Sequence, residues 1–257
     1  MTNRGFNRGS LLLLVGLLVL YTAVGIGWRH LLDPSKGMDW LLLGIWAAMT
    51  GLVVWGIDPR ADLRLAAVAL CGGFVIEWWG TNTQLWRYFV DERPPLWILP
   101  AWPIAALSIE RLTRLAEARL PDMRRLYWFV VPGFVLLMIR FLWPTIRVSA
   151  SQVVIALMVL VTITGRRRDR DMALFVVGAA FGFLLEYWGT TRYCWIYYTA
   201  EHPPLVAVLA HGFASIAFAR GVDAVLALRI AIGWDRSPTV PLSESVDGPS
   251  NPAQASH

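Results

Sequence analysis

Eight long apolar stretches dominate this chain and restrict what it can fold into. A stretch of about 20 residues wound as a helix crosses the hydrocarbon core of a bilayer, and a helix satisfies its own backbone polar groups. Only 16% of the 257 residues are charged, which is too few to cover a soluble domain of this length. The sequence therefore predicts an all-α polytopic membrane protein with about eight transmembrane helices, at residues 10–28, 38–57, 63–80, 96–115, 126–143, 148–165, 172–189 and 205–232.

The connections between these stretches carry unequal positive charge, which predicts their orientation. Fourteen basic residues lie in connections on the side of both termini, and six lie on the other side. Basic loops stay in the cytoplasm, so both termini are expected there, in a bacterial inner membrane. The loops 81–95 and 190–204 are then expected to face outward. The arginines are scattered between apolar runs, so no nucleic-acid partner is expected.

The chain repeats itself at a spacing of 109 residues. From position 73 to 111, fifteen of 39 positions are identical to the residue 109 positions later, and several of these are Trp, Gly or Pro. Each copy holds four apolar stretches, so both copies should have the same orientation. We expect two parallel four-helix repeats, 1–115 and 116–236, related by a pseudo-two-fold axis along the membrane normal. The polar, Pro- and Ser-rich residues 237–257 are expected to be a disordered tail.

A glutamate lies inside apolar sequence in each copy, at Glu77 and Glu186. A carboxylate near a helix C-terminus in a membrane is costly, and needs an arginine, a Trp or Tyr hydrogen bond, or protonation. Arg87, Arg140 and Arg192 lie on the appropriate side. Two interpretations remain open. Each glutamate holds its loop by hydrogen bonds to Thr or Trp, or the two form a desolvated acid site that donates a proton into one shared cavity.

The copies differ at a position that suggests different roles. Trp102 in the first copy corresponds to His211 in the second, where His211 lies at a depth similar to that of Glu186. The two side chains could therefore meet, although a histidine in a span is also often a hydrogen-bonded core residue. The candidate catalytic residues are Glu77, Glu186, His211, Tyr88 and Tyr197.

Aromatic residues cluster beside the two glutamates. An interfacial belt explains single tryptophans, whereas a cluster suits an extended apolar or polyene ligand and stabilises a carbocation through its π faces. The candidate substrate-binding residues are Trp79, Trp86, Trp102, Trp188, Trp195, Thr81 and Thr190. We expect no cofactor. A metal at His30, His202 and His211 is conceivable, but their spacing does not require one, and no phosphate loop or G-x-S-x-G motif is present.

The duplicated motif resembles the carotenoid biosynthesis membrane family that includes bacterioruberin- and γ-carotene-type hydratases. The resemblance covers about forty residues in each copy and rests on Glu77, Gly80, Thr81, Thr83, Tyr88, Pro94, Pro95 and Trp102, and on Glu186, Gly189, Thr190, Tyr197, Tyr198, Pro203 and Pro204. The chain departs from it where QLWR and YCWI replace a Gly-x-Pro-Phe-Gly-like segment, and where His211 replaces the Trp. The resemblance implies protonation of an isoprenoid double bond by a carboxylic acid, followed by hydration or cyclisation.

Two other functions compete with such an enzyme. A lipid or small-molecule transporter would share the parallel repeats, but it needs a polar path through both leaflets, and the inner halves of the stretches carry few polar residues. A structural subunit of a membrane complex would use the Trp-rich surface as an interface. The substrate class that we expect is an apolar isoprenoid or polyene lipid.

Overall fold

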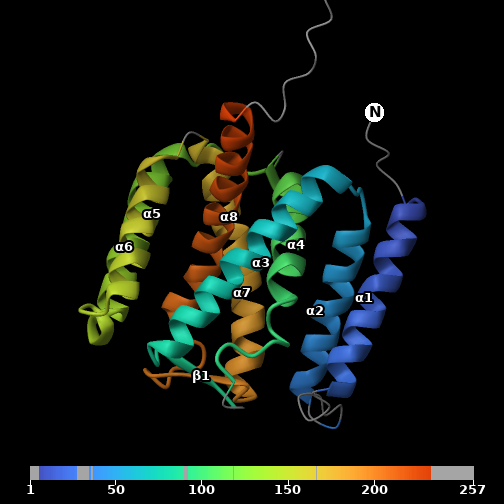
Figure 1. The fold of residues 1–257 in the computed structure, drawn as a ribbon, viewed down its shortest axis with the longest axis horizontal. Coiled ribbons are helices and arrows are strands. Elements are labelled where there is room, and N and C mark those ends of the chain that lie inside the picture. Colours follow the sequence, from blue (N-terminus) through green and yellow to red (C-terminus); the bar gives the residue numbers. More distant parts are fainter. Residues whose placement is uncertain are drawn as a thin grey trace, which may run out of the picture. The chain divides into compact units, whose positions relative to one another are not determined.

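The computed structural model describes residues 6–27, 35, 37–89, 92–117, 119–165 and 167–232, and every structural statement here concerns these residues. Within them the chain forms eight α-helices and two short strands (Figure 1). The elements are α1 (Arg8–Gly27), α2 (Gly37–Val54), α3 (Pro59–Asn82), β1 (Trp86–Tyr88), α4 (Ala101–Glu117), α5 (Arg124–Phe141), the 3-10 turn η2 (Trp143–Thr145), α6 (Ser149–Ile163), α7 (Arg168–Thr191), β2 (Trp195–Tyr197) and α8 (Leu205–Ala231). The predicted all-α class is confirmed.

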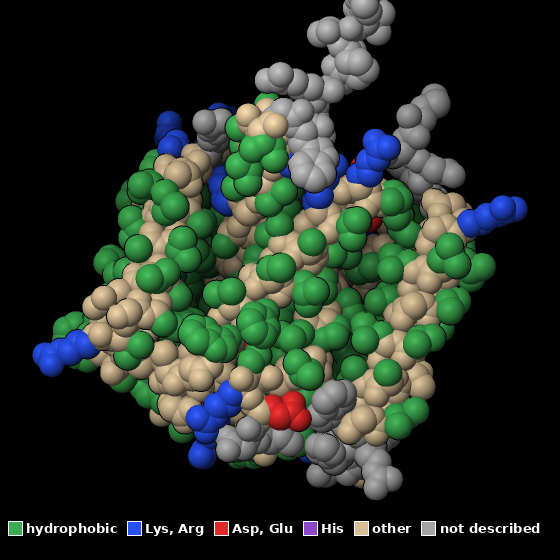
Figure 2. Space-filling model, in the orientation of Figure 1, with side chains coloured by type: hydrophobic (Ala, Val, Ile, Leu, Met, Phe, Trp, Pro, Cys, Tyr) green, Lys and Arg blue, Asp and Glu red, His purple; other side chains and the backbone are tan. Residues whose placement is uncertain are grey.

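Five of the described helices are long and apolar enough to cross a membrane: α1, α2, α3, α7 and α8. α6 is a shorter apolar helix. Figure 2 shows hydrophobic side chains covering most of the displayed face, with Arg and Lys side chains gathered near its edges. This is the make-up of a multi-pass membrane protein, while the arrangement with eight spans stays a prediction.

The chain divides into two compact units, one ending at Asp223 and one beginning at Ala224. In the second unit the structure describes the last turns of α8 and Ile232. The expected disordered tail, 237–257, lies outside the described residues. The packing described below belongs to the first unit.

The helices that carry the two glutamates, α3 and α7, begin and end at positions 109 residues apart. Each begins four residues before its predicted apolar run, because its first turn is charged. In α3 the first turn is capped by Asp58, whose Oδ1 accepts a hydrogen bond from the Ala61 amide at 3.2 Å. Acidic residues follow in both first turns, where they favour the positive end of the helix dipole.

Both helices end in the same hydrogen-bonded turn. The amide of Leu85 donates to the Gly80 carbonyl at 3.0 Å, and the amide of Cys194 donates to the Gly189 carbonyl at 2.8 Å. These are the long bonds of a Schellman motif, which needs a left-handed residue just before the donor. Gln84 and Tyr193 take that conformation, with φ of 59° and 56°. The turn reverses the chain so that β1 and β2 follow directly.

The strands β1 and β2 pair with each other as an antiparallel ribbon. Trp86 faces Tyr197, Tyr88 faces Trp195, and Arg87 faces Ile196 at the centre. The central pair, Arg87 and Ile196, occupies positions 109 residues apart. In the two flanking pairs each residue faces the counterpart of the other pair's residue, because Trp86 corresponds to Trp195 and Tyr88 corresponds to Tyr197. Because alternate side chains of a strand share one face, Trp86 and Tyr88 lie on one side of the ribbon together with Trp195 and Tyr197.

The helices after the ribbon begin at different points, contrary to the prediction of a span at 96–115. α4 begins at Ala101 and residues 96–100 form turns, whereas α8 begins at Leu205, the counterpart of Leu96. Pro100 explains the difference, because a proline lacks an amide hydrogen and disfavours helical conformation in the residue before it. In the second copy Leu209 stands at that position, and nothing interrupts the helix.

Small residues bring α7 and α8 into close contact. A Cβ added at Gly212 would lie 2.4 Å from the Phe175 carbonyl oxygen, and one at Gly178 would lie 2.7 Å from Ser215 Oγ. At these two positions only glycine permits the observed approach. The close approach fixes α8 against α7 along the stretch that faces the cavity described below.

An ion pair closes each helix pair at the end opposite the ribbon. Arg111 Nη2 of α4 lies 2.6 Å from Asp62 Oδ2 of α3, and Arg220 of α8 pairs with Asp171 of α7. Asp62 lies fifteen residues before Glu77, which is about 22 Å along the helix at 1.5 Å per residue. The polar contacts at the two ends of α3 and α7 are therefore separated by most of a bilayer core.

Candidate functional site

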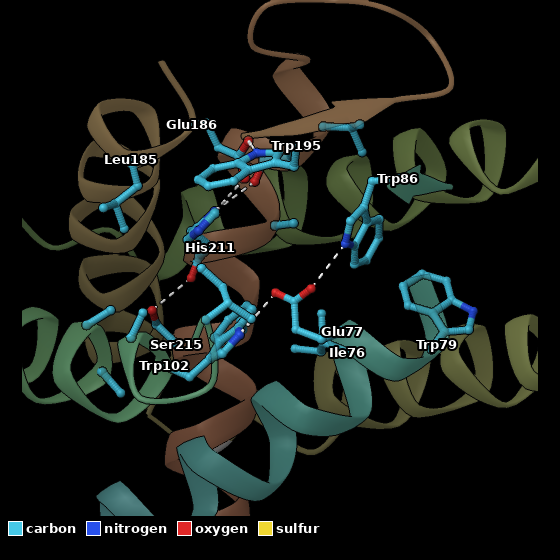
Figure 3. Close-up of a pocket in the computed structure, with 18 of the residues that line it drawn as sticks. Ile76, Glu77, Trp79, Trp86, Trp102, Leu185, Glu186, Trp195, His211 and Ser215 are labelled. Carbon is cyan, nitrogen blue, oxygen red and sulfur yellow. Dashed lines mark hydrogen bonds and ion pairs between the residues drawn. The ribbon is translucent and has the colours of Figure 1, made fainter. Parts of the chain in front are cut away.

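A cavity of about 160 Å³ lies among α3, α4, α7, α8 and the ribbon. Apolar and aromatic side chains form most of its wall, including Trp102, Phe141 and Phe218. Both buried glutamates line it, Glu77 from α3 and Glu186 from α7 (Figure 3). The expectation that the two carboxyl groups face one shared apolar chamber thus agrees with their placement.

Three donors hold the carboxylate of Glu77. Tyr88 Oη donates to Oε2 at 2.8 Å, and Trp86 Nε1 donates to the same oxygen at 3.1 Å. Trp102 Nε1 donates to Oε1 at 3.2 Å from the other side of the cavity. Every donor is a phenol or an indole, so the charge of a carboxylate here would be met by dipoles. Among the described residues, no cation pairs with Glu77.

Two donors hold Glu186, from the positions that correspond to the ribbon donors of Glu77. Trp195 Nε1 donates to Oε2 at 2.8 Å, and Tyr197 Oη donates to Oε1 at 2.9 Å. The position that corresponds to Trp102 is His211, whose Nδ1 lies 3.9 Å from Glu186 Oε1. That separation is too long for a hydrogen bond. Glu186 therefore has one donor fewer than Glu77 on the side that faces the cavity.

His211 makes its hydrogen bond along its own helix. Its Nδ1 lies 3.0 Å from the Ala207 carbonyl oxygen. A carbonyl oxygen only accepts, so Nδ1 carries a proton, and in the neutral ring Nε2 is left as an acceptor. The ring stacks on Trp102, with centroids 6.0 Å apart and planes 10° from parallel. Glu186 and His211 therefore lie close together, as predicted, with their nearest nitrogen and oxygen atoms at van der Waals distance.

Four glycines make room for these contacts, and the sequence analysis did not assign them to the site. A Cβ at Gly80 would lie 1.9 Å from the Trp86 ring, and one at Gly189 would lie 2.0 Å from the Trp195 ring. The other pair, Gly73 and Gly182, would meet Trp102 at 2.2 Å and His211 at 2.5 Å. The signal was present in the sequence, since in each copy two glycines seven residues apart flank the glutamate on one helix face.

The phenols are held as donors. Burial, together with the neighbouring carboxyl groups, raises the pKa of Tyr88 and of Tyr197 well above the ordinary value of a tyrosine. Both side chains therefore stay protonated at neutral pH, and each O–H points its proton at a carboxyl oxygen.

The two threonines predicted to bind substrate do not line this cavity. Thr81 Oγ1 donates to the Glu77 carbonyl oxygen at 2.7 Å, and Thr190 Oγ1 donates to the Glu186 carbonyl oxygen at 2.6 Å. A threonine in a helix readily bonds to the carbonyl four residues earlier, so its hydroxyl is used within the last turn. The two residues support the helix ends, and the expected bonds from Thr to the carboxyl groups are absent from the described contacts.

Two other predicted tryptophans join the copies to each other. Trp79 Nε1 donates to Ser151 Oγ near the start of α6 at 3.2 Å, and Trp188 Nε1 donates to Asp39 Oδ1 near the start of α2 at 3.1 Å. Arg192, expected as a counter-charge for a glutamate, pairs instead with Asp39 through Nε at 2.8 Å. Trp79 also lines the 160 Å³ cavity, whereas Trp188 lines a second one.

The structure gives no ligand set for a metal. Within the described residues, no three His, Cys, Asp or Glu side chains lie close enough to hold an ion. His202 packs edge-on against Tyr193, with ring centroids 5.3 Å apart. His30 lies outside the described residues.

Comparisons of the chain with protein-family models, with curated proteins and with solved structures gave no match.

Proposed function

We propose that this protein is an integral membrane enzyme that protonates a carbon–carbon double bond of an isoprenoid-type lipid, leading to hydration or cyclisation. The observation that carries the proposal is the placement of Glu186 in an aromatic-lined apolar cavity, with one cavity-facing donor fewer than Glu77. The resemblance to the carotenoid-type hydratases points to the same chemistry.

Glu186 is the proton donor in this proposal and Glu77 is its partner. A carboxyl group whose oxygens already accept three donors is stabilised as the anion, so the Glu77 arrangement favours a fixed negative charge. That charge, together with the faces of Trp86, Trp102 and Trp195, would stabilise a positive charge that develops in the cavity.

The chemical steps balance without a further reactant besides water. The π electron pair of the alkene forms a C–H bond with the Glu186 proton and leaves a tertiary carbocation and a carboxylate. In hydration, water oxygen bonds to the cation and its extra proton passes to the carboxylate, directly or through His211 Nε2. In cyclisation, a second double bond attacks the cation, and a proton lost from carbon returns to Glu186.

The cavity volume restricts what enters. A dry protein cavity of about 150 Å³ accommodates a benzene-sized molecule, so this one accepts about six carbon atoms, near the size of one isoprene unit. Only the end of a long lipid would occupy the acid site. The terminal double bond of an acyclic isoprenoid is the group that meets this limit.

Deuterium incorporation tests the proposal. The full chain in lipid nanodiscs, incubated with acyclic isoprenoids in D₂O, should place one deuterium on carbon, together with one OD group in hydration or with ring closure and loss of one proton in cyclisation, read by mass spectrometry. Glu186→Gln should lower the rate about a thousandfold. Glu201→Gln, an exposed carboxylate outside the cavity, is the matched control and should leave the rate unchanged. Equal rates for Glu186→Gln and the wild type would refute the proposal.

The membrane arrangement is proposed with it. Eight helices cross the bilayer as two parallel repeats with both termini in the cytoplasm, and the ribbon lies toward the outside. The corresponding helix limits of α3 and α7, the crosswise pairing of β1 with β2, and the two ion pairs at the opposite end support this arrangement. The transporter alternative has less support, because the cavity wall away from the two glutamates and His211 is mostly apolar.

A further inference from the structure

A second cavity, of about 100 Å³, lies beside the first. α1 and α2 form its outer wall, where Tyr21 and Trp46 stack with ring centroids 5.0 Å apart and planes 8° from parallel. Trp97 and Trp188 close its other side. The wall is almost entirely hydrocarbon and aromatic, so water is poorly accommodated there and an apolar chain is well accommodated.

A thin partition separates the two cavities. Four residues line both of them: Ile98, Ala101, Leu185 and Trp195. Leu185 and Trp195 appear at the edge of the acid site in Figure 3. Trp195 is also the indole that donates to Glu186, so a ligand that passed the partition would lie directly against the proposed acid. Ala101 is the smallest of the four, with a single methyl group as its side chain.

The outer wall is only one helix deep. Of the twenty residues of α1, only Ser10 and Leu17 are buried, and the residues of α1 that line the second cavity have lipid-facing neighbours such as Leu18 and Val19. A lipid chain could therefore reach the second cavity beside α1 without crossing the polar ribbon.

We propose that the second cavity binds the following part of the same lipid chain whose end lies at Glu186. This inference rests on the proposed function for its choice of ligand class. Because a cavity of about 150 Å³ accommodates a benzene-sized molecule, the two cavities together accept about ten carbon atoms. The ligand class is thus an isoprenoid that extends at least about two isoprene units from its reacting end.

Photo-crosslinking tests the second cavity without relying on catalysis. The probes are a five-carbon and a ten-carbon isoprenyl alcohol, each with a diazirine next to the oxygen, added to the full chain in nanodiscs. The ten-carbon probe should label the α1 and α2 peptides that contain Tyr21 and Trp46, and the five-carbon probe should label only peptides of the first cavity. Labelling confined to the first cavity with both probes would overturn the inference.

Glycine substitutions on α1 provide a matched pair. Gly25 lines the second cavity and Gly16 does not, and a Cβ at either position meets no atom within 4 Å. Gly25→Leu should fill the cavity and reduce labelling by the ten-carbon probe about tenfold, while Gly16→Leu should not. Unchanged labelling in Gly25→Leu would overturn the inference.

Labelling of the second cavity and deuterium incorporation are measured separately. Labelling of the second cavity without incorporation sustains the binding site and refutes the chemistry, and incorporation without such labelling does the reverse.

Discussion

The arrangements around Glu77 and Glu186 use the same parts and differ at one position. In each, a glycine three residues after the glutamate accepts an indole ring, a left-handed residue reverses the chain, and a short strand returns a Trp and a Tyr to the carboxyl group. At the remaining position Trp102 donates to Glu77, whereas His211 lies 3.9 Å from Glu186 and bonds to its own helix.

This difference shows how a duplicated scaffold can separate two roles. The shared parts fix both carboxyl groups with the same backbone, so neither copy needs a cation. The one changed position then decides whether the carboxyl group accepts a third hydrogen bond, as Glu77 does from Trp102, or only the two from the ribbon, as Glu186 does. In the proposed function the stabilising role belongs to Glu77 and the reactive role to Glu186, and we expect substitutions to affect the copies unequally.

The largest difference in unfolding free energy should appear between substitutions at the two contacts that join the copies. Asp39 is fully buried and pairs with Arg192 and Trp188, so Asp39→Asn leaves a partly buried arginine without its charge partner and should cost about 4 kcal/mol of unfolding free energy. Ser151 accepts from Trp79 in a neutral contact, and Ser151→Ala should cost about 1 kcal/mol. Unfolding midpoints in mixed detergent micelles measure both, and similar losses would contradict the account.

The next largest effect should be equal in the two copies. Alanine at Gly80 or Gly189 would place a methyl group inside the neighbouring indole ring and displace it, at a cost of about 3 kcal/mol in each case. Gly44→Ala is the control, because its Cβ meets no atom within 4 Å and the change favours a helix. Thermal unfolding of the three variants checks this, and an unaffected Gly80→Ala would show that the indole does not pack as described.

Removing a phenol oxygen should lower the unfolding free energy by different amounts in the two copies. Tyr88→Phe leaves Glu77 with Trp86 and Trp102, whereas Tyr197→Phe leaves Glu186 with Trp195 alone. We expect losses of about 1 kcal/mol for Tyr88→Phe and about 2 kcal/mol for Tyr197→Phe, because each oxygen of Glu77 keeps a donor after the substitution, whereas Oε1 of Glu186 loses the donor that Tyr197 supplies. The reverse order in unfolding experiments would mean that the third donor does not compensate.

The smallest stability effects concern the position that differs. Trp102→Phe removes a donor from Glu77 and should cost about 1 kcal/mol, whereas His211→Phe removes no bond to Glu186 and should cost less. In deuterium incorporation the order should reverse, with His211→Phe the more damaging variant. A larger stability loss for His211→Phe would make it a core residue and remove its proposed part in proton transfer.

The sequence predicted the parts of this arrangement that depend on local spacing. The 109-residue repeat placed both glutamates near helix ends, and the pairing of Trp102 with His211 in the alignment placed a histidine near Glu186. The contacts between copies could not be predicted, because Asp39 and Arg192, or Trp79 and Ser151, lie far apart in the chain and no pattern connects them. The start of α4 was missed because hydropathy does not register what Pro100 does to the backbone.

The central claim is that Glu186 carries the proton and Glu77 carries the charge, and infrared spectroscopy tests it most directly. The wild-type protein in nanodiscs near neutral pH should show the carbonyl stretch of a protonated carboxyl group that shifts in D₂O. We predict that Glu186→Gln abolishes this band and that Glu77→Gln preserves it. A band that persists in Glu186→Gln and disappears in Glu77→Gln would assign the proton to the other copy and contradict the account.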